Sequence, residues 1–171
     1  MKRHQVLTFG ASALLAAALA GCTSFAPVYG DASGTGMASA RFNFAPPANR
    51  LEQVILNRLG VAFSNSAGPG DPTLRVSARR SSPSAALSDT FAVGTPVNVR
   101  VEATITIVQA GKTLFTATRF ADGAYQGDKL SGVDLASSAG TGEQVAESVA
   151  EALRAAIISG YRPGAVSTPV R

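Results

Sequence analysis

The sequence contains few of the residues that bind metals or carry out nucleophilic catalysis. Its 171 residues include one cysteine, one histidine and no tryptophan. The histidine is His4, so the chain from Cys22 onward contains no histidine and no second cysteine. Zinc, copper and haem sites of the usual ligand types need several such side chains, and Cys–His or Ser–His–Asp catalysis needs a histidine. Those sites are excluded after residue 21, and so is an internal disulfide bond.

Long apolar runs are also rare, and the one that stands out lies near the N-terminus. Lys2 and Arg3 precede an apolar run over residues 6–20, and small residues close it. The run is too short and too rich in alanine to span a membrane comfortably, and its flanks are typical of a secretory signal peptide. A retained anchor helix is the alternative. We therefore expect residues 1–21 to be a signal peptide and the rest of the chain to hold the folded protein.

The chain after the signal peptide has little excess of positive charge. Without Lys2 and Arg3 the 15 basic residues fall to 13, against 11 acidic ones, a balance of +2. This balance does not indicate nucleic-acid binding. Of the 13 basic residues 11 are arginines, which suit bidentate contacts with phosphate or carboxylate. A GC-rich genome would produce the same bias.

The single cysteine lies in a specific local pattern. The sequence LAGC (residues 19–22) comes directly after the apolar run and resembles the bacterial lipobox. In that motif the cysteine is diacylated, the signal is cut before it, and the new amine is acylated. Several acyl chains hold a protein durably at a membrane surface. We therefore expect Cys22 to carry a covalent lipid and no other cofactor to be present. Thr23 in place of aspartate implies, by resemblance to sorted lipoproteins, an outer-membrane location.

The first part of the mature chain predicts a tether, a strand and a helix. Residues 22–36 are rich in Gly, Pro and small side chains, as expected of a tether. Residues 37–44 alternate in polarity, which predicts a half-buried strand. Asn49 with Glu52 three residues later resembles a capping box, and apolar residues follow at helical spacing. This predicts an amphipathic helix whose solvent-facing side includes Glu52.

Three further strands and a second helix are predicted downstream. Residues 73–80 alternate, and so do residues 97–107 within a longer segment from 90 to 109. The turn QAGK (residues 109–112) fits a tight hairpin with Gly111 at positive φ, and residues 113–125 return as the partner strand. A Gly/Ser-rich passage then leads to a helix over residues 141–160.

The ends of that last helix carry their own signals. Thr141 and Gln144 resemble a second capping box, and Gly160 is suited to end the helix. Residues 161–171 are rich in Pro and Gly and are expected to be disordered.

The order of these elements predicts an α+β fold. Strand–helix–strand implies a right-handed crossover and a parallel first pair, and the short turns then add antiparallel strands. The result is a two-layer sandwich, a four-stranded mixed sheet in the order β-α-β-β-β-α with two helices on one face. The other face carries arginines and many threonines, so it is either wet or covered by a partner.

These residues together resemble a known family, the LPS-assembly lipoproteins (LptE, formerly RlpB). The resemblance rests on four segments: GCTSFAPVYG after the lipobox, the helix RLEQVILNRL, the hairpin VRVEATITIVQAGKTLFTATRFADGAYQ and the closing helix AESVAEALRAAI. It covers most of residues 19–158, with the family-like domain at residues 37–160. The turn at residues 109–111 lacks the acidic residue typical of the family, and the stretch after Tyr125 is unusually rich in Gly and Ser.

The resemblance implies a function without catalysis. Such proteins act as a plug inside a large outer-membrane β-barrel, LptD, on the periplasmic side, where they support barrel assembly and help deliver lipopolysaccharide to the outer leaflet. Arginine and lysine suit lipopolysaccharide phosphates. The candidate contacts are Arg79 and Arg80 first, then Arg100, Arg119 and Lys129, and each could equally be a solvated or barrel-facing charge.

Two other classes of function are alternatives. One is a different envelope lipoprotein that serves as an auxiliary binding component of a lipid transporter. The other is an enzyme built on Lys129 with Ser131 or on Asp128 with Asp122. These side chains lie in a predicted loop without a motif, and loose positioning is poor for catalysis. We therefore expect a protein that is not an enzyme.

Overall fold

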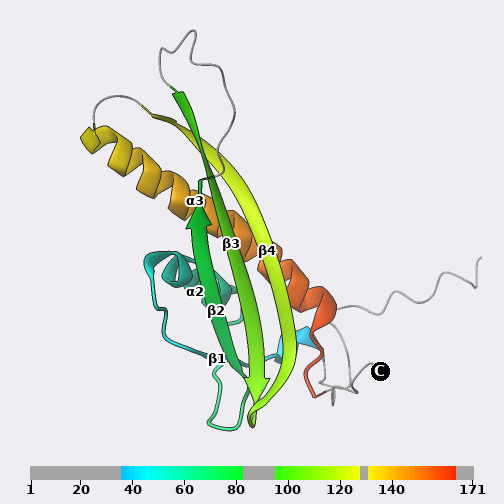
Figure 1. Ribbon diagram of the computed structural model, residues 1–171. Coiled ribbons are helices and arrows are strands. Elements are labelled where there is room, and N and C mark those ends of the chain that lie inside the picture. The colour runs from blue at the N-terminus through cyan, green and yellow to red at the C-terminus, as the bar shows by residue number, and fades with distance from the viewer. Residues whose placement is uncertain (1–35, 83–94, 128–130, 165–171) are drawn as a thin grey trace, which may run out of the picture.

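The computed structural model describes residues 36–82, 95–127 and 131–164, which form one α+β domain. In chain order the elements are η2 (Met37–Ser39), β1 (Asn43–Phe44), α2 (Arg50–Ala62), β2 (Thr73–Ser81), β3 (Thr95–Gln109), β4 (Lys112–Gly127) and α3 (Ser131–Gly160). The strands form one sheet in the order β1-β2-β3-β4, with β1 parallel to β2 and the other pairs antiparallel. Both helices lie on one face of the sheet (Figure 1). The predicted two-layer fold is confirmed.

The start of α2 confirms the capping box but changes the place of Glu52. The Asn49 side chain accepts a hydrogen bond from the Glu52 N–H at 3.0 Å, and Glu52 Oε2 accepts one from the Ala48 N–H at 2.6 Å. The prediction that Glu52 faces solvent is wrong, because its side chain is buried. Glu52 Oε1 also accepts a hydrogen bond from the Ala78 N–H of β2 at 3.2 Å, which draws the carboxylate under the sheet edge.

The first predicted strand is mostly irregular. Only Asn43 and Phe44 pair with β2, and a 3-10 turn occupies the start of the predicted strand over residues 37–44. The Asn43 side chain donates to the carbonyls of Gly68 and Asp71, which holds the chain against the loop before β2. The alternation in polarity therefore arises from an irregular segment that buries Phe42 in the core, whereas Phe44 lies exposed.

The last helix begins ten residues earlier than predicted, at Ser131. Thr141 lies inside the helix, so the second capping box is wrong. Packing explains the difference: a helix supported by the sheet tolerates glycines that would weaken it in isolation. The predicted end at Gly160 is confirmed, and the next residue, Tyr161, is buried rather than part of a free tail. Its ring centroid lies 5.4 Å from that of Phe42.

Strands β3 and β4 form the long central hairpin. On β3 the alternate residues Val99, Val101, Ala103, Ile105 and Ile107 are buried against the helices, as the alternation predicts. The turn has positive φ at both Ala110 (49°) and Gly111 (77°), where the sequence predicted it for the glycine alone. This is the pair of left-handed residues that a two-residue hairpin turn of type I′ requires.

The hairpin extends past β2 at its open end. Strand β2 ends with Ser81 opposite Arg100, so among the described residues only β4 pairs with residues 95–99 of β3. The opposing segment of β4 contains Gly123, where α3 approaches closely: a Cβ at this position would lie 2.5 Å from Val145 Cγ2. The glycine therefore allows the helix to lie directly on the two-stranded part of the sheet.

The two helices lie side by side with a constant offset. Arg50 Nε of α2 lies 2.9 Å from Glu143 Oε1 of α3, and Arg58 Nε lies 2.7 Å from Glu151 Oε1. The residue numbers in both pairs differ by 93, so the helices run parallel in one register. All four side chains are well exposed, so each pair contributes little to stability.

Replacing Glu52 tests its role as the link between α2 and β2. Glu52→Gln keeps the size of the side chain but removes the charge and one acceptor, so a partly buried N–H, of Ala48 or Ala78, loses its partner. We expect the free energy of unfolding to fall by about 1–3 kcal/mol, measured by urea denaturation. Asn57→Ala, at an exposed position of the same helix, is the control and should change it by less than about 0.5 kcal/mol. Equal effects of the two substitutions would contradict the role assigned to Glu52.

Candidate functional site: the open face of the sheet

The face of the sheet away from the helices carries mostly polar side chains in a regular arrangement. Successive rows across β2, β3 and β4 are Arg75–Thr106–Thr116, Ser77–Thr104–Thr118, Arg79–Glu102–Phe120 and Ser81–Arg100–Asp122. We call these twelve residues the open face. They alternate along each strand with the residues that face the helices, so one binary pattern creates both surfaces.

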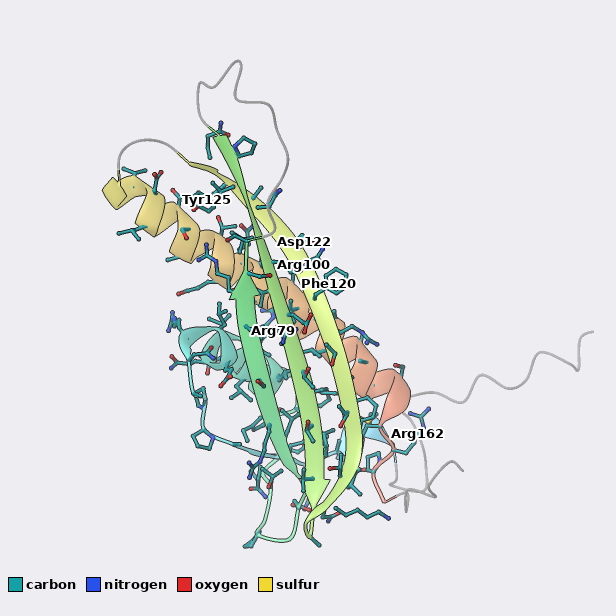
Figure 2. The ribbon with its side chains drawn as sticks, viewed as in Figure 1. Arg79, Arg100, Phe120, Asp122, Tyr125 and Arg162 are labelled. Atoms are coloured by element: carbon teal, nitrogen blue, oxygen red, sulfur yellow. The ribbon has the colours of Figure 1, made fainter. Side chains whose placement is uncertain are left out.

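Two ion pairs join neighbouring strands on this face. Arg79 Nη2 on β2 lies 2.5 Å from Glu102 Oε1 on β3. Arg100 donates two hydrogen bonds to Asp122 on β4, from Nε at 2.6 Å and from Nη2 at 2.8 Å. Figure 2 shows the labelled members of this group, Arg79, Arg100, Phe120 and Asp122, on the side of the sheet that faces the viewer.

The Arg100–Asp122 ion pair is bidentate, and an aromatic ring lies beside it. The Arg100 guanidinium carbon lies 4.5 Å from the centre of the Phe120 ring, within the range of a cation–π contact. Hydrogen bonding to Arg100 lowers the pKa of the Asp122 carboxyl and raises the pKa of the Arg100 guanidinium. Both groups therefore stay charged at neutral pH and neutralise each other.

The remaining rows of the open face carry mainly hydroxyl groups. Thr104 Oγ1 and Thr118 Oγ1 lie 2.8 Å apart and share a hydrogen bond across β3 and β4. Arg75, in the row with Thr106 and Thr116, is exposed, and no ion pair to it occurs within residues 36–82, 95–127 and 131–164. This arrangement can bind a polar partner through neutral donors and acceptors, with little net charge to attract an anion.

The structure does not bring the five basic candidates together. Arg79 and Arg80 are adjacent in sequence, but successive residues of a strand point to opposite faces. Arg79 lies on the open face, whereas Arg80 turns to the helix layer and donates to the carbonyl (3.2 Å) and hydroxyl (2.6 Å) of Ser138 on α3. Neighbouring basic residues on a strand therefore form no joint phosphate site here.

The other candidates are also dispersed. Arg100 shares the open face with Arg79, one row away, and both guanidinium groups are ion-paired. Arg119 lies opposite Ala103 and so on the helix side of β4, where Nη1 donates to the carbonyl of Thr118 at 2.7 Å. Lys129 and the lipidation candidate Cys22 lie outside the described residues.

Sequence reasoning placed Glu102 on this face, but it missed the exposed aromatic residue there and the pairing of the arginines with Glu102 and Asp122. The Phe120 side chain is 56 % exposed. The alternation of β4 contained the signal, because Phe120 falls in step with Thr118 and Asp122 rather than with the core residues. A second apolar surface lies beside α2, where Phe44 and Val61 are 36 % and 79 % exposed.

Two further features bear on the class of site. The part of the chain that the structure describes contains no group of three or more His, Cys, Asp or Glu side chains placed to hold a metal ion. None of its helices combines the length and the apolar composition needed to cross a membrane.

The Arg100–Asp122 pair predicts a pH dependence. The folded-state pKa of Asp122 is depressed, so the pair stabilises the fold above the ordinary carboxyl pKa and loses this effect as pH falls through the depressed value. We expect an NMR titration of the Asp122 carboxyl to have its midpoint below the reference value of 3.8 and to return toward it in Arg100→Gln. Thr104→Val, elsewhere on the same face, should leave the midpoint unchanged. The same midpoint with and without Arg100 would contradict the assignment.

Comparison with known proteins places the fold. No protein-family model matches the sequence, and no curated protein does. Among solved structures, the chain is similar to a lipoprotein from Caulobacter crescentus CB15, with a TM-score of 0.53 and 14 % identity over 69 % of this chain and 88 % of that one. It is equally similar to a minor lipoprotein from Acinetobacter baumannii, with a TM-score of 0.53 and 19 % identity over 74 % and 94 % of the two chains. The chain therefore has the fold of these two bacterial lipoproteins.

Proposed function

We propose that this chain is a non-enzymatic lipoprotein of the outer membrane, anchored through Cys22 on the periplasmic side. In this proposal it occupies the lumen of an LptD-like β-barrel, supports its assembly and assists the delivery of lipopolysaccharide to the outer leaflet. The lipobox and the family resemblance of the sequence suggest this function. A fold shared with two bacterial lipoproteins is consistent with it.

The observation that carries the proposal is the composition of the open face. The lumen of a large membrane barrel is polar, so a protein inside it should present hydroxyl and paired charged groups rather than an apolar patch. The open face offers Thr104 and Thr118 in one row and the pairs Arg79–Glu102 and Arg100–Asp122 in the next two. Apart from Arg75, which has no ion-pair partner in the described part of the chain, such a face can contact a polar wall without burying an unpaired charge.

The proposal includes direct contact with lipopolysaccharide, and the available hydrogen-bond donors favour one arginine for that contact. The Arg79 side chain is 77 % exposed and donates to Glu102 through Nη2, so other guanidinium donors remain available to a phosphate. Arg100 uses two donors on Asp122, and Arg80 would have to leave Ser138. We therefore propose Arg79 as the first contact for a phosphate.

The barrel partner is tested by purification from membranes. A tagged, lipidated chain extracted in detergent should bring down one large outer-membrane β-barrel in stoichiometric amount, identified by mass spectrometry. Cys22→Ser is the matched control: it lacks the thiol that takes the acyl chains, so it should be absent from the outer-membrane fraction and bring down no barrel. Recovery of the lipidated chain without a barrel would refute the proposal, and recovery with a lipid transporter would favour the auxiliary-lipoprotein alternative.

Charge reversal on the two faces of β2 tests the contact with lipopolysaccharide. We expect Arg79→Glu to weaken binding of purified lipopolysaccharide about tenfold, the effect of losing one charge-assisted hydrogen bond. Arg80→Glu should weaken it far less, because that residue lies on the helix face of the same strand. Binding that both variants leave unchanged would sink the assignment of Arg79.

A further inference from the structure

The two edges of the sheet differ in how their outward backbone groups are hydrogen-bonded. At the edge of β2, strand β1 pairs with Thr73 and Leu74. Higher on the same edge, Glu52 Oε1 accepts from the Ala78 N–H at 3.2 Å and Asn49 Nδ2 donates to the Ala78 carbonyl at 3.2 Å. The other edge is β4, the last strand of the sheet, and no strand from the described ranges pairs with its outer side. One edge is therefore closed by the chain's own groups. Within the described ranges the other edge has no strand beside it, and its Thr118 carbonyl is bound by the Arg119 side chain, which an added strand would have to displace.

The residues that direct backbone groups outward from β4 follow from the hydrogen-bond pattern. On β2 the Leu74 carbonyl accepts a hydrogen bond from the Ala45 N–H, on the side away from β3. The backbone N–H and C=O groups of the even-numbered residues of β2 therefore point away from β3. Antiparallel ladders alternate strictly. Through the registers of β2–β3 and β3–β4, the outward-facing residues of β4 are Thr116, Thr118, Phe120, Asp122 and Ala124. The outward direction of the Thr118 carbonyl is supported by its hydrogen bond, because it accepts from the side chain of Arg119 rather than from β3.

This outer edge lacks three of the usual protections against strand addition, although it does carry charged side chains at Arg119 and Asp122. Natural edge strands are shortened, bulged or interrupted by proline. Strand β4 is 16 residues long and contains no proline, and its one irregularity of register lies near the turn, at Ile107/Val108. In Figure 1 the C-terminal part of α3 emerges beside the outer edge of β4, where it would support one face of an added strand.

Two side chains at the middle of this edge define what an added strand should carry. Arg119 projects on the helix side, is exposed, and makes no ion pair with any residue in the described part of the chain. Phe120 projects on the open face and is 56 % exposed. A strand laid beside β4 would place one residue opposite each of them, and cross-strand pairs of matching chemistry stabilise such a strand.

We propose that the outer edge of β4 binds an extended segment of a partner protein by strand addition. The segment carries an Asp or Glu opposite Arg119 and an apolar residue opposite Phe120. In an antiparallel arrangement the apolar residue comes first and the acid follows directly. This proposal does not depend on lipopolysaccharide or on a barrel partner.

A second copy of the chain fits this edge less well. Directly opposed residues of two strands share a face, so a second β4 would have to supply the acid from its own helix-side residues. Those residues from Phe115 to Tyr125 are Phe115, Ala117, Arg119, Ala121, Gly123 and Tyr125, none of them acidic. The charge of Arg119 therefore favours a different protein as the occupant.

The test titrates the isotope-labelled full-length chain in detergent micelles with the synthetic peptide Thr-Val-Thr-Ile-Glu-Val-Thr-Val. We expect NMR shifts and slower amide exchange at the outward residues of β4. Replacing the peptide's Glu by Lys should weaken binding about fivefold, the upper range for one exposed ion pair. Arg119→Glu should reverse that preference, because the attraction then lies with the lysine peptide.

A second variant tests the backbone itself. Thr118→Pro removes an N–H that points away from β3, so the sheet should keep its ladder while peptide binding falls about tenfold. Thr118→Val keeps the N–H and is the matched control. The proposal is overturned if the two peptides bind equally, if Thr118→Pro binds normally, or if the β4 amides do not respond. Sedimentation showing a dimer that Thr118→Pro dissociates would assign the edge to a second copy and overturn it as well.

Discussion

The fold depends on the junction between the start of α2 and the edge of β2. Glu52 is buried and accepts hydrogen bonds from the N–H groups of Ala48 and Ala78. Asn49 accepts from the Glu52 N–H and donates to the Ala78 carbonyl. Two side chains thus cap a helix and close a sheet edge together. Burying the Glu52 carboxylate without these donors would cost free energy. The position of α2 is therefore coupled to the position of β2.

The junction orders the rest of the domain. With α2 fixed against β2, the parallel register of α2 and α3 places α3 along the sheet, where the long hairpin of β3 and β4 packs on it. The alternation of each strand then divides its side chains between the core and the open face. Closure at one edge also leaves the remaining edge as the side at which the sheet can still grow. The polar surface and the free edge are consequences of the same arrangement.

The sequence predicted the architecture well because its strongest signals are local. The alternation over residues 97–107, the turn at residues 109–112 and the Asn49–Glu52 capping box each depend on neighbours within a few residues. The errors concern long-range contacts. The burial of Glu52 depends on Ala78, and the early start of α3 depends on support from the sheet. No local pattern contains this information.

The candidate site was predicted less completely for the same reason. Arginine content identified possible anion contacts, but their partners lie on neighbouring strands: Glu102 lies 23 residues from Arg79, and Asp122 lies 22 residues from Arg100. Only the register of the sheet shows that these arginines are neutralised. The alternation of β2 already implied that Arg79 and Arg80 face opposite ways, and Phe120 could have been found from the same rule on β4.

The extension of the hairpin beyond β2 has a consequence for motion. In the described part of the chain, residues 95–99 pair only with β4, so the layer above α3 is two strands wide there and lacks the neighbouring strand β2. Regions with few packed neighbours open locally at a free energy well below that of global unfolding. We therefore expect this end of the hairpin to open locally more readily than the part of the sheet that is three strands wide. That end can bend or twist to follow a surface while the Glu52 junction stays intact.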